Sequence, residues 1–288
     1  MVIKAPKKFV FAPSDKFGMI SFLNKVLKAK GDSIIIDVST TEEISEGGFL
    51  ALKAQVEKAV MSSSRRLLFI INNPKSRFVR DFLKTKFNKH ESSQKTEFHV
   101  NMSIGKDVKI DTVTDPTFVD KIVKGLKKVG IKEYFDPFYD YLVELIGNAT
   151  EHGIKNRNLN WWLIHYRDRK TNSMCYVFVD MGVGIAGSHR DAGLPLKYRL
   201  SADKHIVKNA FSGNLGSSTK QKNRGNGLPF IKEIVEKGYL SNFLLISNRV
   251  SASEVDGNLV YSRNRNFVGT YYSWSINKEN VLLWKNSR

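Results

Sequence analysis

Three polar side chains lie four residues apart within one mostly apolar stretch. They are Glu144, Asn148 and His152, in the run from residue 136 to residue 153. At 3.6 residues per turn the three fall on one side of a helix, so an acid, an amide and an imidazole would share one face. Such a row can orient water, bind a cation and contact an anion. An ordinary amphipathic helix with its polar face in water is the other interpretation.

The same stretch carries signals for both ends of a helix. Asp136 is suited to the N-cap, Pro137 to the first turn and Gly153 to the end. We therefore expect a helix over 136–153 that packs through its apolar face. The positions left for packing are Leu142, Leu145, Ile146 and Ala149.

Two glycine-containing segments follow this helix. In the first, an apolar strand runs into Asp180, and Gly182 and Gly184 come next. In the second, Gly225 and Gly227 precede an amphipathic helix. Glycine lets a backbone approach a ligand closely, and the free N–H groups at a helix N-terminus bind phosphate oxygens. Each segment alone is also typical of a plain turn.

These residue types have a common use beside a triphosphate. An Mg²⁺ ion that holds a triphosphate keeps several waters, so one protein oxygen such as that of Asn148 can suffice. Glu144, one turn earlier, could orient or deprotonate an attacking water or hydroxyl. Asp180, at the end of a strand, can accept a hydrogen bond from an exocyclic amine.

The order and spacing of the segments are more specific than any one of them. E-x-x-x-N from residue 144, D-x-G-x-G-I from 180 and G-x-G-L-x-x-I from 225 resemble the N, G1 and G2 boxes of the GHKL ATPases. That superfamily includes gyrases, heat-shock chaperones, histidine kinases and mismatch-repair proteins. Val268-Gly269-Thr270 is similar to its short final glycine box, and the resemblance covers residues 117–276. The N-box sequence N-A-T-E-H-G, residues 148–153, is most similar to the corresponding motif of the anti-sigma-factor serine kinases.

The resemblance implies ATP and Mg²⁺ as cofactors. It makes Glu144 the catalytic residue, Asn148 the metal ligand and Asp180 the acceptor for the adenine amine. His152 keeps two interpretations, a role on the phosphate side and that of a packed or capping histidine. The segment 187–224 matches the ATP lid, a mobile cover over the triphosphate. The nucleotide-binding residues implied are Asn148, His152, Asp180, Gly182, Gly184, Ile185, Lys220, Arg224, Gly225, Gly227, Leu228 and Thr270.

The first hundred residues alternate between strand and helix signals, which predicts a small α/β domain. Through the segment 34–52, this domain resembles the STAS domain of anti-sigma-factor antagonists, and the resemblance covers roughly residues 8–90. Aligning Asp37 with the strand-end Asp of that family and Gly48 with its motif glycine puts Gly47 where the antagonists carry the phosphorylated hydroxyl. Ser45 could still take phosphate, or it could be the N-cap of the next helix. Strands are expected over 8–11, 33–38 and 66–71, and helices over 16–30, 46–61 and 74–87.

A polar stretch over 88–116 is expected to connect two domains. The predicted division is a STAS-like domain with its linker over 1–112 and a GHKL domain over 113–288. The predicted fold class is α/β, with an N-terminal STAS-like domain followed by a GHKL (Bergerat) α/β sandwich of a mixed sheet and a helical layer. In the second domain we expect helices over 117–129 and 136–153, and strands over 160–166, 173–180, 243–247 and 268–276.

Composition fits a globular chain of 288 residues with 41% hydrophobic residues. Cys175 is the single cysteine, which excludes a disulfide framework and a cysteine-based zinc site. No apolar run approaches the roughly 20 residues of a membrane-spanning helix, and the N-terminus lacks a hydrophobic signal core. We therefore expect a soluble, cytoplasmic protein without a membrane partner.

The formal charge of +18 is spread along the chain. Residues 1–112 contain 20 Lys and Arg against 12 Asp and Glu, and the rest contain 26 against 16. An excess of positive charge that is spread evenly along the sequence supports nucleic-acid binding only weakly, because a basic surface exposed to water has the same composition.

Three classes of function remain. The first is an ATP-dependent regulatory switch coupled to the STAS-like domain, the second a protein serine/threonine kinase acting on a separate partner, and the third a nucleic-acid-associated ATPase. Because Gly47 has no hydroxyl to accept phosphate, the regulatory switch is favoured over a protein that phosphorylates its own STAS-like domain. The sequence leaves the oligomeric state open, a homodimer included.

Overall fold

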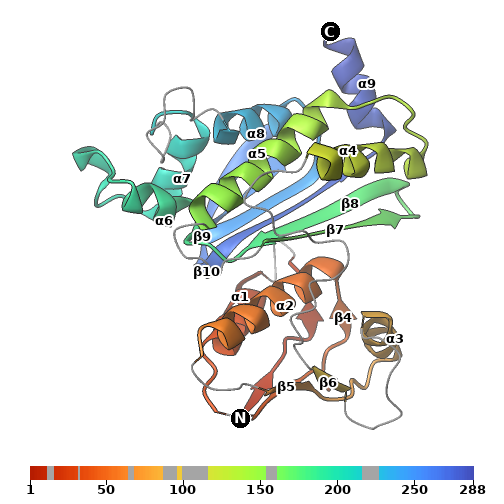
Figure 1. Ribbon diagram of the computed structural model, residues 1–288, viewed down its shortest axis with the longest axis vertical. Helices are drawn as coiled ribbons and strands as arrows, with labels where there is room; N and C mark the ends of the chain where they lie inside the picture. The colour runs from red at the N-terminus through yellow and green to blue at the C-terminus, as the bar shows by residue number, and fades with distance from the viewer. Residues whose placement is uncertain are drawn as a thin grey trace. The chain divides into compact units, whose positions relative to one another are not determined.

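The chain divides into two compact units, Met1–Lys109 and Ile110–Arg288. The computed structural model describes residues 1–11, 16–31, 33–63, 68–86, 96–98, 116–153, 161–215 and 227–288. Each unit has a four-stranded sheet of its own together with helices, so the predicted α/β class is confirmed (Figure 1).

The sheet of the first unit is mostly parallel. Its order is β1-β3-β5-β6, in which the first three strands run parallel and the last is antiparallel to its neighbour. Two helices between the parallel strands pack against each other, and a third follows β5. The elements are β1 (Val2–Lys4), α1 (Lys16–Leu27), β3 (Ser33–Asp37), α2 (Glu46–Met61), β5 (Leu68–Ile71), α3 (Arg77–Lys86) and β6 (Thr96–Phe98).

The strand expected over 8–11 is present but shorter, as β2 (Lys8–Phe9), and it pairs with β4 (Glu43–Ile44) outside the main sheet. Two strands of the main sheet were not expected. The first strand is β1, whose three residues are too few to show an alternating pattern. In addition, β6 lies within the stretch expected to be only a connection. Its pairing with β5 depends on distant residues, which local polarity does not reveal.

The start of α2 explains why glycine occupies the segment that resembles the antagonist motif. Ser45 is the N-cap, and its Oγ accepts a hydrogen bond from the Gly48 N–H at 3.0 Å. A side chain at Gly48 would overlap the carbonyl oxygen of Phe9. The helix thus begins in close contact with the chain that precedes it, and the predicted capping role of Ser45 is confirmed.

The sheet of the second unit has the order β7-β8-β10-β9. Every pair in it is antiparallel, so the mixed sheet expected for this domain was wrong for the described strands. The physical reason is connectivity, because two of its three neighbouring pairs are hairpins, which can only be antiparallel. The strands are β7 (Trp161–Asp168), β8 (Ser173–Asp180), β9 (Ser241–Val255) and β10 (Asn258–Ile276).

Helices α4, α5 and α8 lie along one face of this sheet (Figure 1). Together they bury one continuous apolar core against the strands. Within the part of the chain that the structure describes, no helix has both the length and the apolar character needed to cross a membrane. The helices of the unit are α4 (Pro116–Lys124), η1 (Gly125–Val129), α5 (Asp136–Gly153), α6 (Gly184–Asp191), η2 (Leu196–Tyr198), α7 (Asp203–Phe211), α8 (Gly227–Glu236) and α9 (Lys278–Asn286).

Helix α5 spans the residues predicted for it and is the centre of this core. Leu142 is fully buried, and the Tyr141 ring meets Trp274 of β10 edge-on at 4.9 Å. Asp136 is not the N-cap, since it lies inside the first turn, where its carboxylate pairs with Arg288 at 2.8 Å. Removing a buried leucine such as Leu142 from a core of this kind costs about 2–5 kcal/mol.

Strands β9 and β10 are longer than predicted because they form one hairpin. Its turn is Asp256-Gly257, and both residues have positive φ, 49° and 73°. An Asp-Gly pair with this backbone is the turn that matches the twist of two antiparallel strands.

Candidate functional site

One pocket in the second unit gathers residues from four separate segments. They come from α5, from the end of β8 with the start of α6, from the start of α8 and from β10. The lining residues are Leu145, Asn148, Ala149, Asp180, Gly182, Val183, Gly184, Ile185, Ser188, His189, Leu228, Thr270 and Tyr272.

On one side of the pocket, α5 meets the first residue of α8. A Cβ added to Gly227 would overlap the carboxylate of Glu144 and would lie 3.4 Å from Nδ2 of Asn148. A larger residue at 227 would have to displace the Glu144 carboxylate from this place. Nδ2 of Asn148 is buried and has no hydrogen-bond partner among the described residues. A buried amide without a partner is costly, and a bound ligand or water would satisfy it.

Asp180 ends β8 at the opposite side of the pocket. Its Oδ1 accepts a hydrogen bond from the Gly182 N–H at 2.8 Å, which folds the D-x-G turn back toward the carboxylate. Across the sheet Asp180 pairs in register with Thr270 of β10. Burial raises the pKa of the Tyr272 hydroxyl, and the negative charge of Asp180 raises it further. Tyr272 therefore stays protonated and can serve as a hydrogen-bond donor at the pocket wall.

An irregularity in β10 brings Thr270 to this position. The pairing of β10 with β9 shifts between Phe267, which pairs with Asn248, and Thr270, which pairs with Ser247. Two residues of β10, Val268 and Gly269, lie within this shift, as in a β-bulge. The V-G-T segment is thus a bulge that directs one strand residue into the pocket.

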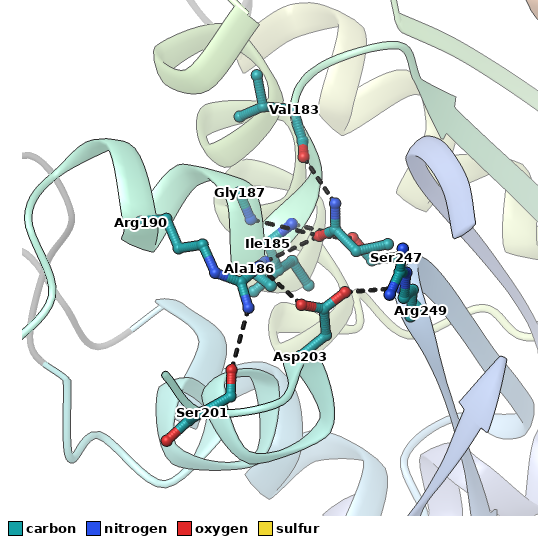
Figure 2. A network of polar contacts seen from close by, with 10 residues as sticks. Val183, Ile185, Ala186, Gly187, Arg190, Ser201, Asp203, Ser247 and Arg249 are labelled. Atoms are coloured by element: carbon teal, nitrogen blue, oxygen red, sulfur yellow. Dashed lines mark hydrogen bonds and ion pairs between the residues drawn. The ribbon is translucent and has the colours of Figure 1, made fainter. Parts of the chain in front are cut away.

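The start of α6 is held by side chains from β9 (Figure 2). Oδ1 of Asn248 accepts hydrogen bonds from the N–H groups of Ala186 at 2.9 Å and Gly187 at 3.4 Å, and its Nδ2 donates to the Val183 carbonyl at 2.8 Å. The Ile185 N–H donates to Oγ of Ser247 at 2.9 Å. These contacts satisfy N–H groups that the first turn of a helix otherwise leaves free.

Gly184 is required at this junction for two reasons. Its φ is +76°, a value that side chains other than glycine rarely adopt. A Cβ there would also lie 2.5 Å from Oδ1 of Asn248. The second glycine of the D-x-G-x-G segment is therefore explained by the capping amide of Asn248.

A second set of contacts fixes the far end of α6 (Figure 2). Arg190 forms an ion pair with Asp203 at 2.6 Å and donates to the carbonyl of Ser201 at 3.1 Å. The other oxygen of Asp203 accepts a hydrogen bond from the Arg249 N–H at 3.1 Å. The start of α6 is thus bonded directly to β9. The end of α6 is connected to β9 through Asp203 of α7. In the predicted lid over 187–224, α6 and α7 are therefore packed helices joined by an exposed segment, and residues 216–224 lie outside the described part.

His189 is a pocket residue that the sequence did not reveal. It is 7% exposed, on the last turns of α6. Burial lowers the pKa of its imidazole below the usual 6.5, so the ring is neutral at pH 7. Ser188 beside it also lines the pocket. Both were missed because the glycine-rich sequence was interpreted as a loop, whereas the capping of α6 comes from residues more than 60 positions away.

Tyr272 could have been found from the sequence. It lies two residues after Thr270 in a strand, and alternate residues of a strand share one face. Leu145 and Ala149 were expected to pack, and they do so at the pocket wall. Val183 had no sequence signal, since it lies between the two glycines of a turn.

The predicted site residues fall into three groups. Asn148, Asp180, Gly182, Gly184, Ile185, Leu228 and Thr270 line the pocket. Glu144 and Gly227 meet beside it, and His152 lies in the last turn of α5, where its side chain is outside the described part. Lys220, Arg224 and Gly225 also lie outside the described residues.

Among the described residues, no group of three or more His, Cys, Asp or Glu side chains could hold a metal ion. A metal held mainly by a ligand's phosphates needs no such group. In comparisons with known proteins, the chain matches no protein-family model and no curated protein.

Proposed function

We propose that the second unit binds Mg-ATP in this pocket and acts as an ATP-dependent regulatory switch of the GHKL type. The observation that carries the proposal is that four distant segments of the chain meet in one pocket. Segments around residues 148, 180, 228 and 270, far apart in sequence, meet in one pocket. Their order in the chain is that of the nucleotide-binding boxes of the superfamily.

The base is assigned to the Asp180 side of the pocket. There a carboxylate at a strand end can accept a hydrogen bond from an exocyclic amine, which adenine presents and guanine replaces by a carbonyl at the same ring position. Ile185 and Leu228 supply apolar surface for a ring. ATP is therefore favoured over GTP.

The triphosphate is assigned to the side where α5 meets α8. The N-terminus of α8 presents N–H groups to an anion, and Gly227 keeps that approach open. The buried Nδ2 of Asn148, which has no partner among the described residues, can donate a hydrogen bond to a phosphate oxygen. Oδ1 of the same amide is the atom that would serve as the single protein ligand of Mg²⁺. When bound, Mg²⁺ would neutralise phosphate charge. The protein's own contribution is the placement of Asn148 and of the helix N-terminus.

Glu144 is assigned the turnover step. Its carboxylate lies at the start of α8, one turn before Asn148 on α5. A carboxylate at this place can accept the proton of an attacking water or hydroxyl as the γ-phosphoryl group leaves ADP. Attack by water gives an ATPase, whereas attack by a side-chain hydroxyl gives a protein kinase.

The regulatory part of the proposal concerns the first unit. It retains a serine at the helix cap but has Gly47 where the antagonists of the STAS family carry a hydroxyl. A domain without that hydroxyl suits transmission of a nucleotide-dependent signal better than acceptance of phosphate. A kinase acting on a separate partner is the second candidate, and the position of Glu144 is the observation that favours it.

The proposal is tested by incubating the intact protein with γ-labelled ATP and Mg²⁺ and measuring free phosphate and labelled protein separately. Free phosphate without labelled protein is the expected result for the switch. Label on an added protein would favour the kinase. If Mg-ATP neither raises the melting temperature nor yields either product, the proposal is contradicted.

A further inference from the structure

The segment between α6 and α7 presents two leucines to water. Leu200 is 102% exposed and Leu196 is 80% exposed, the two highest values among the large hydrophobic side chains of the described residues. One exposed leucine is ordinary on a protein surface. Two in a single short segment expose apolar surface that burial against a partner would remove from water. We call residues 195–200 the leucine loop.

The leucine loop is held in one shape. The Tyr198 N–H donates to the carbonyl of Pro195 at 2.8 Å, and the Arg199 N–H donates to that of Leu196 at 3.2 Å. The Tyr198 hydroxyl contacts Oδ1 of Asn209 on α7 at 3.3 Å. Just after the loop, Arg190 of α6 fixes the carbonyl of Ser201 (Figure 2). A fixed loop loses little conformational entropy when a partner binds.

Charge limits what can bind there. Lys197 and Arg199 are exposed between the two leucines. Of the acids that flank the loop in sequence, Asp203 is paired with Arg190, and Asp191 is exposed at the end of α6. A second copy placed by a twofold axis would bring the same two cations against each other, in a chain whose net charge is +18. A partner whose charge complements Lys197 and Arg199 would be acidic.

We propose that the leucine loop is the docking site for an acidic protein partner. Leu196 and Leu200 would enter an apolar recess on that partner, and carboxylates around the recess would pair with Lys197 and Arg199. This is the usual plan of a small interface, with buried anchors and a polar rim. Two leucines offer too little apolar area for stable attachment to a membrane surface. The Tyr198 hydroxyl donates to Asn209, and the Lys197 ammonium lies 4.8 Å from the centre of the Tyr198 ring.

The test uses an array of synthetic acidic peptides that each contain two large apolar residues. A matched array has every carboxylate residue replaced by lysine. Binding of the full-length protein is measured by fluorescence anisotropy at low and high salt. We expect binding to acidic peptides only, weakened by salt. The double variant Leu196→Ser with Leu200→Ser should lose on the order of tenfold or more in affinity for each leucine.

Two further variants separate apolar from electrostatic effects. Lys197→Glu with Arg199→Glu should reverse the preference between the two arrays. The control is Leu282→Ser with Leu283→Ser on α9, where the leucines are 55% and 51% exposed. It should bind as the wild type does.

Four results would overturn the proposal. The first is equal binding to both arrays, or to neither, and the second is unchanged binding by the leucine-loop variant. The third is a leucine-dependent association with vesicles of phosphatidylcholine and phosphatidylserine without peptide binding, which would indicate a membrane surface instead. The fourth is a dimer, seen by sedimentation, that the leucine-loop variant dissociates, which would indicate a second copy.

Discussion

Glu144 and Asn148 are one helical turn apart on α5, and both face the first residue of α8. The acid and the amide therefore share the place where an anion would meet the N-terminus of a helix. A carboxylate there repels phosphate unless a cation or a proton intervenes. This arrangement is understandable if the site holds a metal-bound triphosphate, and it would be unfavourable for phosphate alone.

Replacement of Glu144 by Gln should separate binding from turnover. The amide keeps the size of the side chain but cannot accept the proton, so the rate of ATP consumption should fall on the order of 10²–10⁴-fold. Affinity for Mg-ATP should be retained. Phosphate release and calorimetry measure the two quantities.

The control for this variant is Asp140→Asn, which changes an exposed acid one turn earlier on the same helix. It should leave turnover unchanged. Wild-type turnover in Glu144→Gln would place the base elsewhere.

Replacement of His189 by Gln should change how stability depends on pH. Burial lowers the pKa of His189 in the folded protein, so below pH 6.5 the unfolded chain binds a proton that the folded chain does not. The free energy of unfolding should therefore fall as pH drops from 6.5 toward the folded pKa. Glutamine carries no such proton, and that part of the pH dependence should disappear.

Denaturant unfolding at several pH values measures this effect. The wild type, measured in the same buffers, is the reference. Identical profiles for His189→Gln and the wild type would contradict the assigned burial.

At the scale of elements, α6 depends on β9 for its start. Asn248 has a positive φ of 52°, and its side chain receives the first N–H groups of the helix. Glycine at this position would keep the backbone conformation and remove the amide. Asn248→Gly should cost about 1–3 kcal/mol of stability, because it leaves buried N–H groups unpaired.

The same variant should also weaken Mg-ATP binding, since α6 lines the pocket. Asn172→Gly is the control, because Asn172 has a similar φ of 49° in the turn after β7, away from the pocket. Equal loss of ATP affinity in both variants would show that the effect is general destabilisation.

Elements were predictable where their signals are local. Helices α2 and α5 were predicted with their observed bounds, because a cap, a proline or a glycine marks their ends. Helix α6 was missed, since its cap comes from Ser247 and Asn248. Strand β6 was missed because three residues show no period. The Asp256-Gly257 turn was a local signal for the long hairpin that sequence reasoning overlooked.

At the scale of the whole molecule, the proposal requires the first unit to respond to nucleotide. A ligand shifts an equilibrium only through different affinities for two states, and such coupling is reciprocal. Mg-ATP should therefore change hydrogen-exchange protection in residues 43–52, at the start of α2. Asp180→Ala protein with Mg-ATP is the control. Unchanged protection in the wild type would mean that the two units are only tethered.

The pocket as a whole was predictable from the order of short motifs, although their convergence depends on long-range packing. Asp180 and Thr270 are 90 positions apart and become register partners only when β8 and β10 pair. The wall formed by Ser188 and His189 could not be predicted, because it exists only once α6 is capped from β9.

The most direct measurement is a calorimetric titration of the full-length protein with Mg-ATP and with Mg-GTP. We predict that ATP binds more tightly than GTP. Asp180→Ala should weaken ATP binding at least tenfold, because it removes a charge-assisted hydrogen bond of about 1.5–3 kcal/mol. Asp168→Ala, at the end of β7 in the same sheet, should bind as the wild type does. Absence of heat with Mg-ATP, or equal affinity in the wild type and Asp180→Ala, would contradict the assignment of the pocket.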